Sequence, residues 1–143
     1  MIKKLWKSTS AQSGEGLKII RITVALIMIV HPVHRIYNGS VAGFGEYLDS
    51  IGYPFGIAVA WLITITQFIG SLALIFGRFI VPLSIANIGI FLVGIVLVHY
   101  QHGWFVVGGG TDGMEFSFTL IVCLAGIIWG YWPRKISSIV NNK

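Results

Sequence analysis

Charge is divided between the two ends of four apolar stretches, and this division constrains the fold more than any other feature of the sequence. If each stretch crosses a lipid bilayer, nine of the ten Lys and Arg residues lie on one side. Four of the five acidic residues and all four histidines then lie on the other side. Membrane proteins collect Lys and Arg in their cytoplasmic loops, so the division predicts a membrane protein with both termini in the cytoplasm.

The two sides of this predicted membrane protein carry different residue types. The side that holds both termini contains Lys3, Lys4, Lys7, Lys18, Arg21, Arg78, Arg134, Lys135 and Lys143, together with Glu15. The far side contains Arg35, Glu46, Asp49, Asp112 and Glu115, together with His31, His34, His99 and His102.

The composition argues against a soluble domain and against a nucleic-acid partner. The chain is 55% hydrophobic and 10% charged, whereas soluble domains are about 25% charged. The net charge of +5 comes from basic residues in short flanks beside the apolar stretches, which suits anionic lipid headgroups better than a DNA groove. The single cysteine, Cys123, lies inside an apolar stretch, so no intrachain disulfide can form.

Four spans are predicted, at residues 17–36, 57–76, 79–98 and 114–132. Each has about the twenty residues needed to cross roughly 30 Å of hydrocarbon. We therefore expect an all-α membrane protein, an antiparallel bundle of four transmembrane helices, with residues 1–143 forming a single domain. Residues 1–16 are expected to be retained as a cytoplasmic lead, and residues 133–143 to form a cytoplasmic tail. Arg21 lies near enough to the inner end of the first span to reach the interface.

The connections between the spans differ in length and character. Gly77-Arg78 leaves almost no loop between the second and third spans, which predicts a tight hairpin. Residues 41–51 alternate apolar and polar positions at helical spacing, which predicts a short amphipathic helix on the outer membrane surface. Residues 100–113 are rich in glycine, and we expect a flexible re-entrant turn there.

Two amides lie inside the predicted spans, where polar groups need partners. Gln67 and Asn87 are at nearly the same distance from the Gly77-Arg78 turn, so we expect them at similar depth. They could form an interhelical hydrogen bond of about 0.6–2 kcal/mol. Alternatively, they could line a cavity for a quinone or a polar substrate.

Small residues mark two further helix contacts. Gly126 and Gly130 form a GxxxG pattern, and Gly70, Ala73 and Gly77 form a stripe on the second span. Both patterns allow helices to approach closely, within one bundle or between two chains.

The outer ends of the spans gather ionisable residues. The histidines occur in two pairs, each three residues apart, with Arg35, Asp112 and Glu115 at the same expected depth. The proline at position 32 is expected to kink or loosen the first span. Three interpretations remain open for this cluster, and a different set of residues carries each one.

The first interpretation is a polar network that closes the bundle, with a salt bridge between Arg35 and Glu115. The second is a metal or a haem iron bound by histidines, for which the candidates are His31, His34, His99 and His102. The third is a proton-handling site beside a quinone or a thiol substrate, in which a carboxylate such as Glu115 fixes a histidine tautomer.

A series of short motifs appears in a characteristic order along residues 18–132. These are Arg21, His31 with Arg35, Gly52 and Pro54, Gly77-Arg78, His102-Gly103-Trp104-Phe105, Gly109-Gly110 and Gly113-Met114-Glu115-Phe116. In order and spacing the chain resembles the DoxX family of small four-helix bacterial membrane proteins. The resemblance implies a subunit of a thiosulfate:quinone oxidoreductase, or of an oxidative-stress or thiol-redox membrane complex.

This chain departs from the family pattern at two positions. Family members usually carry Glu where this chain has Gln67, which cannot exchange protons. The His-Gly of the family's first span is His31-Pro32 here. Glu115 is retained.

These observations lead to one functional hypothesis. The chain is a membrane redox subunit of the bacterial inner membrane that binds a quinone or a small sulfur compound. His31 and Glu115 are the candidate catalytic residues, and Arg35, His99, Gln67 and Asn87 are the candidate binding residues. The sequence has no flavin or iron–sulfur motif, so electron transfer would need a bound haem or metal, or a membrane or periplasmic partner protein that carries the redox centre.

Two alternatives belong to other classes of protein. The chain could be a non-catalytic subunit that assembles or anchors a larger membrane complex. It could also be a small transporter with Gln67 and Asn87 as a midplane site, although four helices without an inverted repeat are unusual for a transporter.

Overall fold

The computed structural model describes residues 13–133, and the described part of the chain is helical with connecting loops and no strand. Its elements in chain order are α1 (Ser13–Tyr37), α2 (Val41–Ser50), α3 (Gly56–Ile75), α4 (Ile80–Gly94), the π-helix η3 (Ile95–His99), the 3-10 helix η4 (Tyr100–His102) and α5 (Glu115–Tyr131). The predicted all-helical fold is confirmed. Most of the expected cytoplasmic lead and tail, residues 1–12 and 134–143, lies outside the described residues.

Three helical segments are long and apolar enough to cross a membrane, namely Gly14–Tyr37, Gly56–Ile75 and Ile80–His102. They correspond to the first three predicted spans. The helix in the fourth predicted span, α5, is shorter but also apolar. Large apolar side chains on these helices are exposed, for example Leu26 at 53% and Leu62 at 66%, as expected for surfaces that face lipid.

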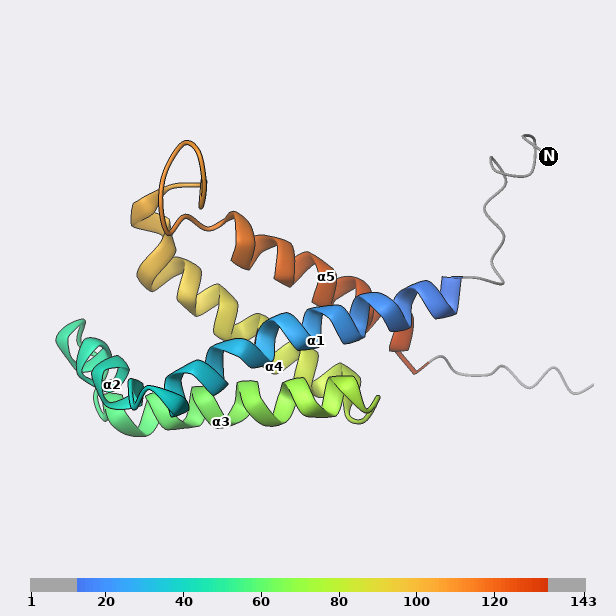
Figure 1. The fold of residues 1–143 in the computed structure, drawn as a ribbon, viewed down its shortest axis with the longest axis horizontal. Helices are drawn as coiled ribbons and strands as arrows, with labels where there is room; N and C mark the ends of the chain where they lie inside the picture. The colour runs from blue at the N-terminus through green and yellow to red at the C-terminus, as the bar shows by residue number, and fades with distance from the viewer. Residues whose placement is uncertain (1–12, 134–143) are drawn as a thin grey trace, which may run out of the picture.

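The helices pack as two neighbouring pairs. Helix α1 packs on α3, α4 packs on α5, and α1 also meets α5 while α3 meets α4 (Figure 1). The two pairs are close together at the turn between α3 and α4 and diverge toward α2 and the loop before α5 (Figure 1). A buried apolar core joins the four helices where they are close, and it consists of Val24, Ala25, Met28, Leu74, Phe91, Leu120, Leu124 and Ile127.

The buried face of α3 is made mostly of small and hydroxyl residues. Thr64 and Ser71 are fully buried, and each hydroxyl donates a 2.7 Å hydrogen bond to the carbonyl oxygen four residues earlier in α3. Their polar groups are therefore satisfied within the helix, and the small side chains let neighbouring helices approach. Gly70 serves the same purpose, because a Cβ atom at this position would lie 2.7 Å from Nδ2 of Asn87 on α4.

Arg21, which the sequence places near the inner end of the first span, is buried inside the protein. Only 7% of the residue is exposed. Its Nη1 donates to the carbonyl oxygen of Leu74 at the end of α3, and its guanidinium lies 5.5 Å from the ring centroid of Tyr131 on α5. Carbonyl groups at a helix C-terminus carry partial negative charge, which favours a cation there. Arg21 therefore joins α1 to the ends of α3 and α5.

The turn between α3 and α4 is short, as the sequence predicts. Residues 76–79 connect the two helices, and Gly77 has a positive φ of 71°. A Cβ atom at Gly77 would lie 2.9 Å from Nη1 of Arg21. Glycine therefore meets two requirements here, the backbone conformation of the turn and the space for the guanidinium.

The amphipathic segment after α1 does form a helix. Helix α2 buries Val41, Gly45 and Leu48 and packs on α3. Oδ1 of Asp49 accepts a 2.8 Å hydrogen bond from the backbone N–H of Gly56, the first residue of α3. This bond satisfies one of the free N–H groups at the start of α3 and fixes the corner between the two helices.

Two other local features bear on the shape of the chain. Helix α1 continues through the fully buried Pro32 to Tyr37 without interruption. The glycine-rich loop at residues 100–113 is folded against itself. The backbone N–H groups of Gly113, Met114 and Glu115 donate to the backbone carbonyl oxygens of Phe105, Gly103 and Trp104 respectively, at 3.0–3.2 Å.

Replacing Gly45 with Ala should destabilise the protein, whereas the same change at Gly43 on the same helix should not. A Cβ atom at Gly45 would lie 2.7 Å from the backbone Cα of Ile57, which cannot rotate away, and overpacking of this kind costs about 1–3 kcal/mol. Nothing lies within 4 Å of a Cβ atom at Gly43. Thermal unfolding of the purified variants in detergent, followed by circular dichroism, measures the difference. Equal midpoints for the two variants would contradict the close approach of α2 and α3.

Candidate functional site

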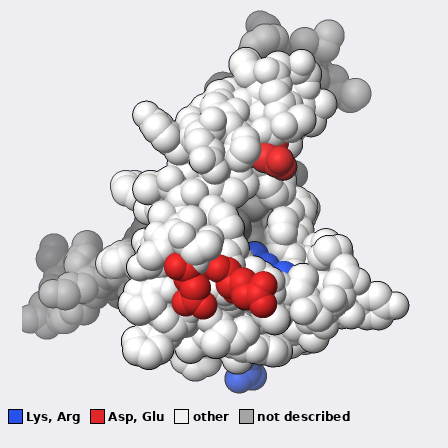
Figure 2. Space-filling model, turned by 90° about the vertical axis from the view of Figure 1, so that its left-hand side faces the viewer, with Lys and Arg blue, Asp and Glu red and all other residues white. Residues whose placement is uncertain are grey.

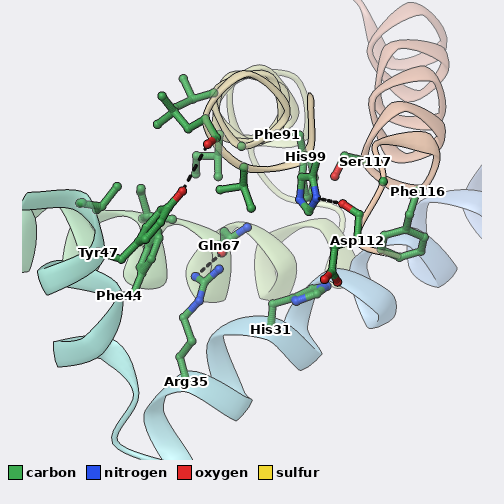
Figure 3. Close-up of a pocket in the computed structure, with 18 of the residues that line it drawn as sticks. His31, Arg35, Phe44, Tyr47, Gln67, Phe91, His99, Asp112, Phe116 and Ser117 are labelled. Atoms are coloured by element: carbon green, nitrogen blue, oxygen red, sulfur yellow. Dashed lines mark hydrogen bonds between the residues drawn. The ribbon is translucent and has the colours of Figure 1, made fainter. Parts of the chain in front are cut away.

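A cavity of about 530 Å³ lies where the two helix pairs diverge (Figure 3). Residues from α1, α2, α3, α4, η3, α5 and the loop before α5 line it. Most of them are apolar, and the polar ones are His31, Arg35, Tyr47, Gln67, His99, Asp112 and Ser117. Sites for small organic ligands typically have this size and this mixture of apolar walls with a few polar groups.

Arg35 and Gln67 form the central polar contact of the cavity. Nη1 of Arg35 on α1 donates a 2.8 Å hydrogen bond to Oε1 of Gln67 on α3. The guanidinium also lies 4.8 Å from the ring centroid of Phe44 on α2, in a cation–π arrangement. Two neighbouring elements therefore orient the guanidinium within the cavity (Figure 3).

The expected salt bridge between Arg35 and Glu115 is not formed. Oε1 of Glu115 instead accepts a 3.0 Å hydrogen bond from the backbone N–H of Val106. Glu115 is not among the cavity-lining residues, whereas Val106 is. The carboxylate of Glu115 therefore holds in place the loop that forms one wall of the cavity.

The expected hydrogen bond between Gln67 and Asn87 is also not formed. The side-chain oxygen Oε1 of Gln67 accepts from Arg35, and Nδ2 of Asn87 donates to the backbone carbonyl oxygen of Leu83 on its own helix at 2.8 Å. Asn87 is fully buried against Gly70, about one turn from Gln67, and does not line the cavity. It acts in helix packing between α3 and α4.

The four histidines separate into two that line the cavity and two that do not. His31 lines it, with its ring centroid 6.5 Å from that of Phe116. His99 also lines it, and its Nδ1 donates a 2.7 Å hydrogen bond to the carbonyl oxygen of Asp112. In neutral His99 this bond leaves Nε2 as an acceptor. His34 is exposed and accepts from Nδ2 of Asn38, and His102 is exposed in η4.

This arrangement does not fit a metal held by the four histidines. Within residues 13–133, no three His, Cys, Asp or Glu side chains are close enough to bind one ion. Each pair of histidines contributes one member to the cavity wall and leaves the other outside it. The cavity residues instead fit an uncharged or anionic organic ligand that accepts hydrogen bonds.

The π-helix η3 forms one side of the cavity. Leu97, Val98 and His99 all line it, and the carbonyl oxygen of Leu97 accepts a 3.2 Å hydrogen bond from the hydroxyl of Tyr47 on α2. π-Helical turns inside longer helices are frequent at functional sites. Sequence analysis did not single out Tyr47 or the π-helix. Only the apolar face of the predicted helix at residues 41–51 pointed to Tyr47.

The end of the molecule that carries α2 is hollowed. Figure 2 shows acidic side chains on this face beside a hollow in which a basic side chain is visible. Arg35 is the Lys or Arg residue that lines the cavity, and Asp112 is the acidic one. The hollow therefore combines a mostly apolar interior with one basic and one acidic side chain, Arg35 and Asp112.

The long apolar helices and their exposed apolar side chains are those of a helical membrane protein. A family model described as DoxX matches residues 16–100, and the chain belongs to the DoxX family. The resemblance drawn from the motifs is thereby confirmed, and the matched region includes His31, Arg35, Gln67 and His99. No curated protein and no solved structure matches the chain.

Replacing Tyr47 with Phe should lower the free energy of unfolding by about 1 kcal/mol, because the Leu97 carbonyl in the π-helix loses its side-chain donor. Tyr100→Phe is the control, since Tyr100 is 71% exposed and its hydroxyl makes no hydrogen bond within the described residues. Thermal unfolding in detergent measures both variants. The proposed role of Tyr47 fails if the two substitutions have the same effect.

Proposed function

We propose that this DoxX family protein is a quinone-binding subunit of a membrane redox complex, with the cavity as its quinone site. The observation that carries the proposal is the guanidinium of Arg35, oriented by Gln67 and Phe44 inside an otherwise mostly apolar cavity. A quinone ring is apolar on its faces and carries carbonyl oxygens that accept hydrogen bonds. Arg35 can donate to one of these oxygens while Phe91 and Phe116 contact the ring.

The proposal includes a position in the membrane. We propose that α1, α3, α4 with its irregular extension, and α5 form an antiparallel four-helix bundle, one domain over residues 1–143, in the bacterial inner membrane. The 17 residues of α5 extend about 26 Å at 1.5 Å per residue, close to the hydrocarbon thickness. The distribution of basic residues supports cytoplasmic termini, and α2 would then lie at the outer interface.

The redox chemistry requires a second protein. Two molecules of a sulfur donor, such as two thiolates or two thiosulfate ions, would join through one new S–S bond and release two electrons. The quinone would take up two electrons and two protons to become a quinol. Because this sequence carries no flavin or iron–sulfur motif, we propose that a membrane or periplasmic partner oxidises the sulfur compound and passes on the electrons.

Within this scheme, His31 and His99 are the residues that handle protons. Both line the cavity, and the tautomer of His99 is fixed by its hydrogen bond to the Asp112 carbonyl. The side-chain amide of Gln67 is not an acid or base, so its role in this scheme is to orient Arg35 through their hydrogen bond. The contact of Glu115 with Val106 supports a positioning role for that carboxylate, and the packing of Asn87 gives no support to a midplane transport site.

An assembly role without catalysis is the second candidate, and one observation on α5 favours it. A Cβ atom at Gly130 would clash with the side chain of Leu17 on α1, whereas one at Gly126 would meet nothing within 4 Å. Gly126 therefore lies on a face of α5 that is open to another helix. A second pocket, separate from the cavity, is lined by Ala125, Ile128, Trp129 and Trp132 of the same region.

Replacing Arg35 with Met should weaken binding of a short-chain quinone about tenfold, the loss expected for one hydrogen bond from a charged donor. Lys18→Met is the matched control, because Lys18 is an exposed basic residue of α1 that pairs with Glu15 and lies outside the cavity. Calorimetric titration of the purified full-length variants with decylubiquinone measures the affinities. Equal affinity for wild type and Arg35→Met, in protein that unfolds at the normal temperature, would refute the proposed site.

A pair of variants distinguishes redox function from assembly. Glu115→Gln should weaken the contact with the Val106 amide and reduce quinone reduction by membranes, while the complex still assembles. Gly126→Leu fills the open face of α5 and should leave the cavity intact. Native electrophoresis of membranes together with quinone reduction measures both properties. Loss of the complex in Gly126→Leu alone, with no effect of Glu115→Gln on activity, would favour the assembly role.

A further inference from the structure

Arg35 brings a positive charge into the cavity without a carboxylate partner. All five acidic residues of the sequence lie in the described range, and the salt bridge found among residues 13–133 joins Lys18 to Glu15. Asp49 is hydrogen-bonded to the start of α3, and Glu115 is hydrogen-bonded to the loop. The partner that Arg35 does have, Gln67, is a neutral amide.

The contacts of the guanidinium orient it but do not neutralise its charge. One of its five N–H donors is used by Gln67, and Phe44 lies against its face. A charge in apolar surroundings raises the free energy unless an opposite charge accompanies it. An anionic group that enters the cavity can therefore form charge-assisted hydrogen bonds with the remaining donors.

The other ionisable groups of the cavity determine the orientation of such a ligand. The backbone carbonyl oxygen of Asp112 accepts a hydrogen bond from Nδ1 of His99. The guanidinium of Arg35 instead contacts Gln67 and Phe44. Figure 3 shows Asp112, His99 and His31 together on one side and the guanidinium of Arg35 beside Gln67. An anion would be repelled by the Asp112 carboxylate and attracted by Arg35. Its charged end should therefore contact Arg35, with an apolar part filling the rest of the cavity.

We propose that the cavity binds an amphiphilic monoanion, with a carboxylate-type headgroup on Arg35 and an apolar tail among the aliphatic and aromatic walls. The tail is required because most of the lining is apolar. Binding of the anion does not depend on the proposed quinone function. Only the regulatory consequence rests on that function, because a bound anion would compete with a quinone for the same space.

Octanoate and octanamide test the proposal, because they have nearly the same shape and differ in charge. Calorimetric titrations of the purified full-length protein in nonionic detergent, corrected by titration of protein-free micelles, give both affinities. Octanoate should bind wild type about tenfold more tightly than octanamide, as expected for hydrogen bonds that gain an ionic partner. Equal affinities would overturn the proposal.

Gln67→Glu should abolish this preference, because it places a carboxylate of nearly the same size on the guanidinium. The ratio of octanoate to octanamide affinity should fall about tenfold. Gln101→Glu is the matched control, since Gln101 is exposed in η4 and does not line the cavity. The ratio should remain at the wild-type value in this control, and an equal loss in both variants would overturn the proposal.

The two proposals can fail separately. If octanoate is preferred but decylubiquinone does not bind, the quinone assignment fails and the anion site stands. If decylubiquinone binds and octanoate shows no preference over octanamide, the anion site fails and the quinone assignment stands. The wild-type comparison needs no substitution, so it remains decisive even if Gln67→Glu does not fold.

Discussion

Two arginines of α1 each bond to α3, and these bonds fix the alignment of the two helices around which the rest of the chain is arranged. Arg21 and Arg35 are fourteen residues apart, about four helical turns, so they lie on the same face of α1. Arg21 donates to the Leu74 carbonyl at the end of α3, and Arg35 donates to the Gln67 side chain. A guanidinium in apolar surroundings needs such partners, which makes sliding or rotation of α1 against α3 costly.

The same pair of bonds marks two ends of the molecule that are packed differently. Around Arg21 the four helices are close, and the Gly77 turn and the Tyr131 ring enclose the guanidinium. Around Arg35 the helix pairs diverge, and the space between them is the cavity. Charge at the first end is used to close the bundle, whereas charge at the second end faces a volume large enough for a ligand.

Much of the fold could be predicted from the sequence, because it depends on length and hydropathy. Three of the predicted spans are long apolar helical segments, and the amphipathic segment after the first span is a helix. Counting residues predicts a similar depth for Gln67 and Asn87, and Asn87 lies against Gly70, about one turn from Gln67. The hydrogen-bond partners of the two amides could not be predicted, because the direction of each side chain around its helix axis depends on packing. Asn87 packs against Gly70 of α3 and donates within its own helix, so it does not bond to Gln67.

The candidate site was predictable only in part, for a related reason. His31, Arg35, Gln67 and His99 were recognised as ionisable or polar residues in apolar stretches, and all four line the cavity. Glu115 was assigned to the same cluster, but its carboxylate is used by the loop amide of Val106. Hydrogen bonds within a folded loop leave no periodic pattern in the sequence. The π-helix and its bond to Tyr47 likewise have no sequence signature.

The π-helix also has a consequence for how the third long helical segment can change. A turn closed by i→i+5 bonds contains one more residue than an α-helical turn, so the side chains after it are rotated by about 100° relative to a continuous α-helix. Phe91 before η3 belongs to the apolar core and also lines the cavity, and His99 at the end of η3 lies in the cavity wall. Shortening this stretch by one residue would restore α-helical phasing and turn the imidazole away from the ligand space, even though every remaining residue kept its identity.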